Sequence, residues 1–240
     1  MPKTDLLLLP GLLCDRAVFE PVLPALEEHA RCLVPEYHDE RSLAAMAQRV
    51  LRDAPERFAL LGHSMGGRVA LEVMRAAPQR VACIALLDTG YQARPDDESG
   101  AHERAERLAL LDVARTQGMR SMGQRWVQRM VHPDRLADAP LIDAILDMIA
   151  RRSTVDFAAQ IQALLARPDA SDVLAAIDVP TLVLCGRDDA WSPLARHQDM
   201  AARILHSTLA VIEQCGHMCT MEQPHPVAAA IVGWLNAGPA

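Results

Sequence analysis

The feature that most constrains this chain is a serine enclosed by glycines in the stretch Gly62–Gly66, which reads Gly-His-Ser-Met-Gly. The stretch follows the apolar run Phe58–Leu61 and precedes the helix-like segment Arg68–Met74. A serine with a glycine two residues away on each side, between a buried strand and a helix, is the sequence form of a nucleophile elbow. Only glycine fits at the flanks of so sharp a turn, and the strained backbone exposes the serine hydroxyl at the carboxyl end of a sheet. The sequence therefore predicts that Ser64 is a nucleophile.

A serine hydroxyl reacts poorly at neutral pH, so this interpretation requires a histidine base and an acid that orients the base. Nine histidines are available, and His217 has the most favourable position. It follows the predicted short strand Ala210–Ile212 and the turn-like segment Gln214–Gly216, so we expect it on a loop at the carboxyl end of the last strand. We predict that His217 is the base.

The acid is expected on another loop that follows a strand. The strand predicted at Pro180–Cys185 is followed by a glycine, an arginine and two adjacent acids, Asp188 and Asp189. Consecutive side chains point in different directions, so only one of the two can reach an imidazole. Asp88, which follows the apolar stretch Val81–Leu87, is a third candidate. We rank Asp189 first, and the alternatives stay open at this point.

Four motifs, taken in order, resemble those of lid-bearing serine hydrolases of the α/β-hydrolase superfamily, and the resemblance covers nearly the whole chain. Leu6–Gly11 is similar to the first core strand and oxyanion turn of that family, with Pro10 where the family usually has histidine. Gly62–Gly66 resembles the elbow, Gly186–Pro193 the acid loop and Gly216–Pro224 the histidine loop. The resemblance implies an α/β-hydrolase fold.

The resemblance also implies the roles of individual residues. In the acid loop of the family the third residue after the glycine is the acid, which corresponds to Asp189. The oxyanion hole would consist of the backbone N–H groups of Leu12 and Met65, which stabilise the negative charge that acyl transfer builds on the carbonyl oxygen. Ser64, His217 and Asp189 would form the catalytic triad. No metal and no organic cofactor are implied.

Strand-like and helix-like segments alternate along the chain, which predicts an α/β fold with a mostly parallel sheet flanked by helices. The strands are expected near residues 5–9, 31–34, 57–61, 81–87, 180–185 and 208–213. Residues 91–170 interrupt this alternation, because they contain amphipathic helical patterns and no good strand. We therefore predict a hydrolase core formed by residues 1–90 and 171–240, with an inserted all-helical cap at 91–170.

The cap is expected to cover the strand ends and to contribute a substrate pocket. Met119, Met122 and Trp126 recur at helical spacing and mark one apolar face. Such a face packs against a core in many helices, but methionine also lines adaptable acyl pockets. Aromatic residues make up only 3% of the chain, so an aromatic-rich pocket is hard to build. An aliphatic acyl group or a small lactone is therefore the better match.

The cap segment from Arg115 to Arg135 contains five arginines and one acid, in a chain whose net charge is −7. These arginines can form a solvated face paired with acids elsewhere. They can also bind an anionic substrate, such as a carboxylate-bearing ester or an acyl group on an acidic carrier protein. Arg125 and Arg129 are our candidates for the second role, and Arg68, just after the elbow, is a further candidate.

Composition limits the other classes of function. The net charge of −7 argues against nucleic acid and anionic membranes as main partners. No apolar run approaches the roughly 20 residues of a membrane span. The first residues do not resemble a signal peptide. The six cysteines have no paired metal-like spacing, and buried free thiols are typical of a reducing compartment. We therefore expect a cytoplasmic enzyme.

The predicted function is hydrolysis of a carboxylic ester of a small or medium aliphatic acid through an acyl-enzyme. The same fold and triad also serve enol-lactonases and hydrolases of carbon–carbon bonds, because function depends on the site rather than on the fold. A hypothesis of another class is a ligand-binding receptor of hydrolase fold that keeps the triad without efficient turnover.

Overall fold

The computed structural model describes residues 3–237 and contains one six-stranded sheet with the strand order β2-β1-β3-β4-β5-β6. Every neighbouring pair is parallel, as the alternation of segments predicted. The fold class is thus confirmed, and the observed strands lie within two residues of the predicted ones. The strands are β1 (Thr4–Leu9), β2 (Ala30–Leu33), β3 (Phe58–His63), β4 (Val81–Leu87), β5 (Thr181–Gly186) and β6 (Ser207–Ile212).

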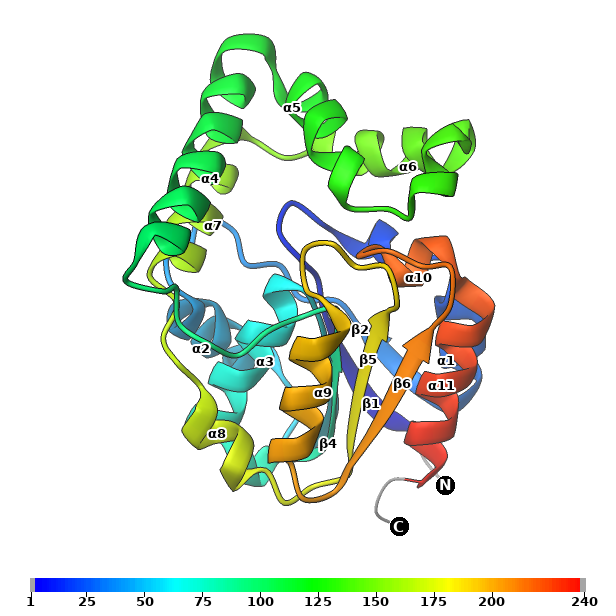
Figure 1. Cartoon of the computed structure of the whole chain (residues 1–240). Coiled ribbons are helices and arrows are strands. Elements are labelled where there is room, and N and C mark those ends of the chain that lie inside the picture. The colour runs from blue at the N-terminus through cyan, green and yellow to red at the C-terminus, as the bar shows by residue number, and fades with distance from the viewer. Residues whose placement is uncertain (1–2, 238–240) are drawn as a thin grey trace.

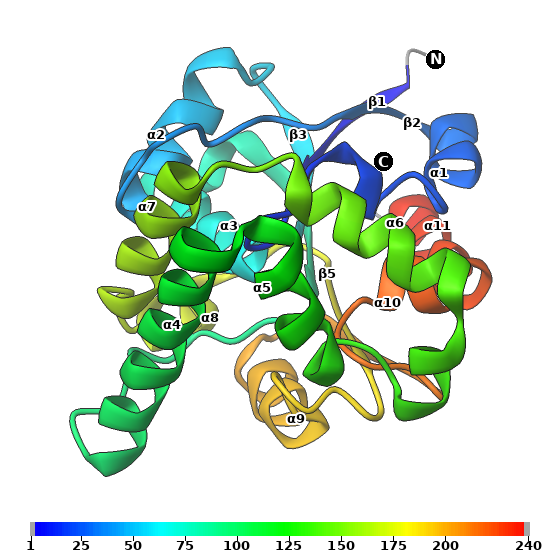
Figure 2. The ribbon, with the colours of Figure 1, turned by 90° about the horizontal axis from the view of Figure 1, so that it is seen from above.

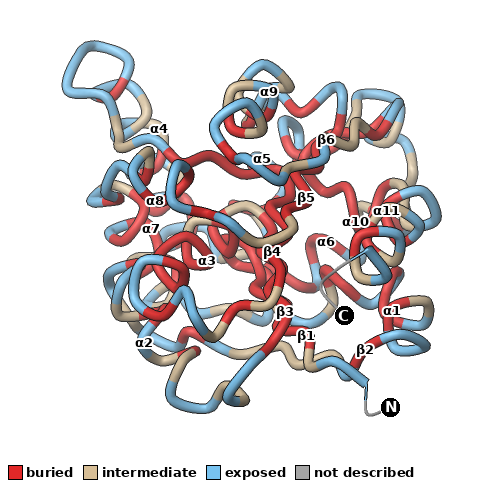
Figure 3. The backbone as a smooth tube through the Cα atoms, turned by 90° about the horizontal axis from the view of Figure 1, so that it is seen from below, coloured by how far each residue is buried: buried red, intermediate tan, exposed pale blue. Residues whose placement is uncertain are grey.

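Helices cover both faces of the sheet, as Figure 1 shows. One face carries α1 (Leu23–His29) and α11 (Pro224–Ala237), and the short α10 (Cys219–Glu222) precedes α11. The central strand β3 is buried along its whole length, which agrees with the rule that parallel sheets are covered on both sides. Figure 3 shows the same pattern, with buried backbone concentrated in the strands. The opposite face carries α2 (Leu43–Asp53), α3 (Met65–Ala76), α8 (Ser171–Ala176) and α9 (Leu194–Arg203).

Four helices between β4 and β5 lie over the carboxyl ends of the strands (Figures 1 and 2). We call them the cap helices: α4 (Glu98–Gln117), α5 (Met119–Trp126), α6 (Ala139–Ala150) and α7 (Thr154–Leu165). Within the described residues, the segment 91–170 contains no strand. The division of the chain into a core and an inserted cap that fold as separate units stays a proposal.

Side-chain caps explain where the cap helices begin. Asp97 accepts hydrogen bonds from the amides of Ser99 and Gly100, which fixes the start of α4 at Glu98. Asp138 caps α6 in the same way, by accepting from the amide of Leu141.

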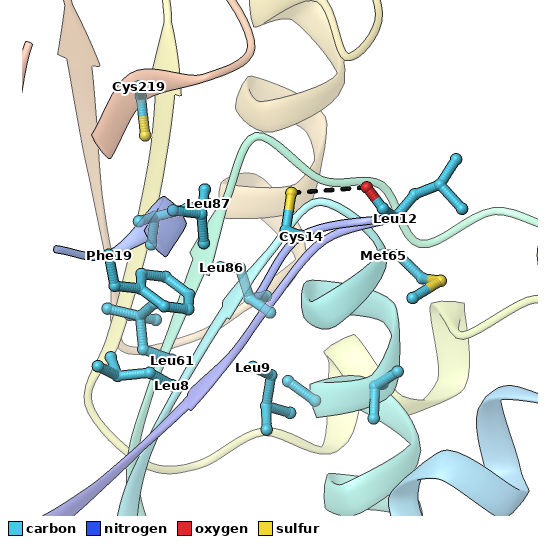
Figure 4. Packing of buried hydrophobic residues seen from close by; sticks show 14 of the residues in the cluster. Leu8, Leu9, Leu12, Cys14, Phe19, Leu61, Met65, Leu86, Leu87 and Cys219 are labelled. Carbon is cyan, nitrogen blue, oxygen red and sulfur yellow. Dashed lines mark hydrogen bonds between the residues drawn. The ribbon is translucent and has the colours of Figure 1, made fainter. Parts of the chain in front are cut away.

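The core lies between the sheet and the helices on its two faces. Figure 4 shows leucines of β1, β3 and β4 packed together beside α3, with Phe19 at one end of the cluster. Leu8, Leu61 and Leu87 have no exposed surface at all. Among residues 3–237, no helix combines the length and the apolar character that a bilayer crossing requires.

The first turn of α3 passes against β1, and this contact generates a stability prediction. A Cβ atom on Gly66 would lie 2.0 Å from the carbonyl oxygen of Leu9, which is backbone that cannot yield easily. We expect Gly66→Ala to lower the free energy of unfolding by about 3 kcal/mol, the upper end of the usual cost of overpacking. Urea denaturation followed by circular dichroism measures this loss.

Gly233→Ala is the matched control, because Gly233 lies inside α11 with no atom within 4 Å of the added Cβ. This variant is expected to gain about 0.5–1 kcal/mol from the better helix propensity of alanine. Equal stability of the two variants would contradict the close approach of α3 to β1.

Candidate active site

Ser64 lies at the turn between β3 and α3, with a backbone conformation that serine rarely adopts. Its φ is 54° and its ψ is −117°, a positive-φ geometry that costs free energy outside glycine. The turn is held on both sides, since the Ser64 amide donates to the carbonyl of Leu87 at 2.9 Å and the Thr89 hydroxyl donates to the carbonyl of Ser64 at 2.6 Å. The hydroxyl of Ser64 consequently faces the carboxyl edge of the sheet from a fixed support.

Two hydrogen bonds connect Ser64 to His217 and Asp189. The Oγ of Ser64 is 2.8 Å from Nε2 of His217, and Nδ1 of His217 is 2.7 Å from Oδ2 of Asp189. His217 and Asp189 are buried, with exposed fractions of 2% and 3%. With Nδ1–H donating to the carboxylate, Nε2 is free to accept the serine proton. This is the geometry of a serine–histidine–aspartate triad.

The other oxygen of Asp189 fixes its carboxylate in place. Oδ1 accepts from the amides of Trp191 and Ser192, both at 2.8 Å. Burial alone would raise the pKa of Asp189, but the His217 ring and the two amides lower it overall. The neighbouring Asp188 has its carboxylate half exposed and 3.6 Å from His132, away from the His217 ring. Of the two adjacent acids, the structure brings Asp189 to the histidine.

Electrostatics favour a basic His217. Burial alone would lower the pKa of its imidazole, but the charge and hydrogen bond of Asp189 raise the pKa above its usual value of 6.5. His63, inside the elbow, lies beside His217 with ring centroids 5.5 Å apart. Burial lowers the pKa of His63 to about 4, so its ring is neutral and donates from Nε2 to the His217 carbonyl at 2.8 Å.

A buried glutamate holds the loop that carries His217, and its role was not recognised from the sequence. The carboxylate of Glu222 accepts from three amides: those of Gly216 at 3.1 Å, Met218 at 3.0 Å and His132 at 2.7 Å. The last of these belongs to the segment between the cap helices α5 and α6. Glu222 and His63 stand inside the motifs quoted above, but only the three-dimensional arrangement reveals what they support.

The two residues whose amides are predicted to form an oxyanion hole lie at the same cavity. The amide of Leu12 belongs to a turn in which Cys14 donates to the Gly11 carbonyl at 3.1 Å. The amide of Met65 is the first amide of α3, and the N-terminus of a helix carries partial positive charge. Within residues 3–237, neither amide donates to an acceptor outside its own element. Both residues line the cavity above Ser64.

That cavity has a volume of about 200 Å³ and is bounded by Ser64, His217 and the cap. Trp126 and Arg129, two of the residues predicted for a substrate pocket, lie on its wall. Met122 is instead fully buried, Met119 packs against the same core, and neither lines the cavity. The apolar face of α5 thus serves packing as well as the pocket.

A second hollow of about 270 Å³ lies beside the first, between α4 and α5. It is mostly apolar, shares Trp126, Trp191 and Arg129 with the cavity above Ser64, and has Arg125 on its wall. Arg125 is exposed and donates to the side chain of Gln117.

Asp88, the third candidate acid, lies fully buried close to the triad but bonds elsewhere. Its Oδ1 accepts from the amide of Gly186 at 2.9 Å, while its Oδ2 has no hydrogen-bond partner among residues 3–237 and lies 3.8 Å from Nε2 of His63. Burial, reinforced by the charge of Asp189, raises the pKa of Asp88 to about 8. No group of three potential ligands suited to a metal ion occurs in the described part of the chain.

A serine on a strand-to-helix turn, a histidine on the last strand loop and a buried aspartate bonded to the other side of that histidine define the class of α/β serine hydrolases. The comparison with known families agrees, because residues 6–230 match the alpha/beta hydrolase family. The chain belongs to that family and is a hydrolase.

Two relatives of known name cover 98% and 71% of this chain. A pimeloyl-[acyl-carrier protein] methyl ester esterase of Pectobacterium carotovorum is 26% identical over 98% of this chain and 95% of its own. A 3-oxoadipate enol-lactonase of Acinetobacter baylyi is 28% identical over 71% of this chain and 60% of its own. Among solved structures, a thermophilic esterase from Thermogutta terrifontis with malate bound is 29% identical, with a TM-score of 0.88 over 98% of this chain and 90% of its own.

The raised pKa of Asp88 predicts how stability depends on pH. Between the usual pKa of 3.8 and the folded value of about 8, the unfolded chain loses this proton and the folded protein keeps it. Stability therefore falls as pH rises through this window. Asn cannot ionise and can still accept from Gly186, so Asp88→Asn is expected to be more stable than the parent near pH ~7.5 and no more stable near pH ~4.

Urea denaturation of both proteins across that pH range measures the difference. Glu213→Gln is the control, because Glu213 is exposed and its pKa is lowered by Arg187 instead of raised. A difference between Asp88→Asn and the parent that does not change with pH would contradict the protonated state of Asp88.

Proposed function

We propose that this protein hydrolyses carboxylic esters of small or medium aliphatic acids through an acyl-enzyme formed on Ser64. The observation that carries the proposal is the unbroken line of two hydrogen bonds, 2.8 Å and 2.7 Å long, from Ser64 through His217 to Asp189. Both partners of the serine are buried, so water competes little for these bonds.

The proposed reaction has two halves. Oγ of Ser64 attacks the ester carbonyl while Nε2 of His217 takes its proton, and the resulting imidazolium returns that proton to the leaving alcohol. Water then attacks the acyl-enzyme with His217 as base, and the acid product leaves as Ser64 regains its proton. Asp189 stays ionised throughout, since its role is to hold the ring and stabilise its cation.

The amides of Leu12 and Met65 would stabilise the carbonyl oxygen in each half of the reaction. Both residues line the cavity, and within residues 3–237 neither amide donates to an acceptor outside its own element, which supports this role. Donors of this kind, already oriented before the reaction, are typically worth about 2.7–4 kcal/mol each.

The size of the site supports a compact acyl group. The cavity above Ser64 has about 200 Å³, and the adjoining apolar hollow offers room for an aliphatic chain or a leaving group. The names of the relatives also support an ester substrate, because two of them describe esterases and the third describes a lactonase. The bound malate of one relative is itself a small aliphatic acid. All six cysteines are free thiols, which supports work in the cytoplasm.

Two other substrates are candidates on specific grounds. The named lactonase supports an enol-lactone, and the named esterase supports an acyl group on a carrier protein. For a carrier, the exposed Arg125 beside the apolar hollow is the available cation. By contrast, Arg120 pairs with Asp143 and Asp147, and Arg129 pairs with Glu106. A screen of purified enzyme against ester, lactone, carbon–carbon and carrier-bound substrates separates these activities from a binding protein without turnover.

The first functional prediction concerns Ser64. Ser64→Ala is expected to abolish hydrolysis of short acyl esters and labelling by a fluorophosphonate, because no other activated hydroxyl shares the bond to His217. Its thermal midpoint should stay close to that of the parent or rise, since alanine removes only the hydroxyl. Substantial turnover by a folded Ser64→Ala protein would show that Ser64 is not the nucleophile and that the reaction takes place at another site.

A second prediction separates the three aspartates. Asp189→Asn should lower kcat by about 10⁴-fold, because an amide cannot hold His217 in the required tautomer. Asp188→Asn is the matched control one residue away, and its half-exposed carboxylate makes no contact with His217. We expect it to keep nearly full activity, and Asp88→Asn to lose far less than Asp189→Asn. If Asp188→Asn were the inactive variant, the proposed triad would be wrong.

A further inference from the structure

The cavity above Ser64 holds more positive charge than its acids balance. Its carboxylates are Glu103, Glu106 and the buried Asp88, whose pKa of about 8 favours the neutral form at pH 7. Guanidinium groups stay charged in proteins and need partners when they are removed from water. Five of them line the cavity: Arg68, Arg107, Arg129, Arg167 and Arg196.

Three of the five arginines are paired with the two glutamates. Arg167 forms a bidentate pair with Glu103, at 2.7 Å to each oxygen, and Arg107 donates to the same carboxylate at 2.8 Å. Arg129, at the rim, lies 3.2 Å from Glu106. These pairs use both glutamates of the cavity, so neither is left for the other two arginines.

Arg68 and Arg196 have only neutral acceptors. Arg68 donates to the carbonyl of Gln92 at 2.9 Å, and Arg196 makes two long contacts of 3.4 Å, to the Trp191 carbonyl and the Ser192 hydroxyl. Neither forms an ion pair with any carboxylate in residues 3–237. Each guanidinium carries five N–H donors, so most of their donors are free for a ligand.

The two side chains come from different helices and meet over the same backbone position. A Cβ placed on Gly90 would lie 2.9 Å from Nη2 of Arg68 and 2.9 Å from Cδ of Arg196, so the missing side chain leaves room for both. Arg68 follows Ser64 by four residues on α3, which is about one helical turn, or ~6 Å along the axis. The backbone of Arg68 is therefore about one turn from the nucleophile, and both arginines line the same cavity as Ser64.

The surroundings of Arg68 and Arg196 disfavour guanidinium groups that have no anionic partner. Burial, and then the guanidinium groups of Arg167 and Arg196, lower the pKa of Arg68. Burial, and then the guanidinium group of Arg167, also lower the pKa of Arg196. An anion between Arg68 and Arg196 would relieve both the repulsion and the loss of hydration.

We propose that Arg68 and Arg196 form a carboxylate subsite, and that the substrate is a monoester of an aliphatic dicarboxylic acid whose free carboxylate binds there while its ester carbonyl lies at Ser64. This inference rests on the proposed ester hydrolysis at Ser64 and names the substrate class. It also replaces Arg125 and Arg129 in the anion-binding role suggested by the sequence, because Arg129 already has Glu106 and Arg125 lies on the neighbouring hollow.

The test compares esters that differ only in the distal charge. The p-nitrophenyl monoesters of succinate, glutarate and adipate are paired with p-nitrophenyl alkanoates of the same chain length, and kcat/KM is measured for each. The parent enzyme should prefer the charged member of at least one pair. In Arg68→Met and Arg196→Met the charged-to-neutral ratio of kcat/KM should fall about 10- to 100-fold, the worth of a hydrogen bond to a charged group. Arg68→Lys should recover part of the ratio.

Arg203→Met is the matched control, because Arg203 lies on the same helix as Arg196, is exposed and pairs with Asp199. Its charged-to-neutral ratio should equal that of the parent. The ratio also distinguishes anion binding by Arg68 from a purely structural role. Loss of the Arg68 bond to Gln92 alone would lower the rates for charged and neutral esters together and leave their ratio unchanged.

A second measurement does not depend on turnover. Glutarate should bind to Ser64→Ala with a Kd that rises at least 10-fold when Arg68→Met is added, as measured by calorimetry. A parent enzyme that is labelled at Ser64 and hydrolyses neutral esters, but shows no preference for the charged ones, would overturn the subsite and leave the esterase proposal intact. Absence of labelling and of hydrolysis of every ester would overturn the esterase proposal itself.

Discussion

The passage of α3 across β1 is the contact on which the rest of the site depends. Gly66 lies so near the backbone of Leu9 that no side chain fits between them, and Gly11 approaches Ser64 from the same strand end. The serine and the turn carrying the Leu12 amide are therefore brought together by main chain, with no long side chain between them. Groups fixed in this way need little reorganisation when charge develops, which is the property that makes such amides effective.

Much of this architecture could be predicted from local patterns in the sequence. Strand positions follow from short apolar runs, and Gly62–Gly66 marks its turn because glycine alone satisfies such close packing. Side-chain direction could not be predicted in this way, since it depends on helices distant in sequence. Arg68 faces the cavity whereas Met122 turns into the core, although each lies on a helix that borders the site.

Two aspartates at the same edge of the sheet differ because their surroundings differ. Asp189 has two amides and the ring of His217, and its pKa falls. Asp88 has one amide beside the neutral ring of His63, and burial raises its pKa. The sequence gives no sign of this difference, because both residues follow a buried strand. With Asp88 protonated, the negative charge acting on His217 comes from Asp189 and is aligned with Nδ1.

Hydrogen bonds connect the cap helices and the segments between them to the core on two sides of the site. The carbonyl of Met130 accepts from the amide of His217 at 2.8 Å, and Gln160 of α7 accepts from the amide of Leu13 at 2.8 Å. Lifting the cap as a rigid body would break these bonds and disturb the histidine loop and the oxyanion turn together.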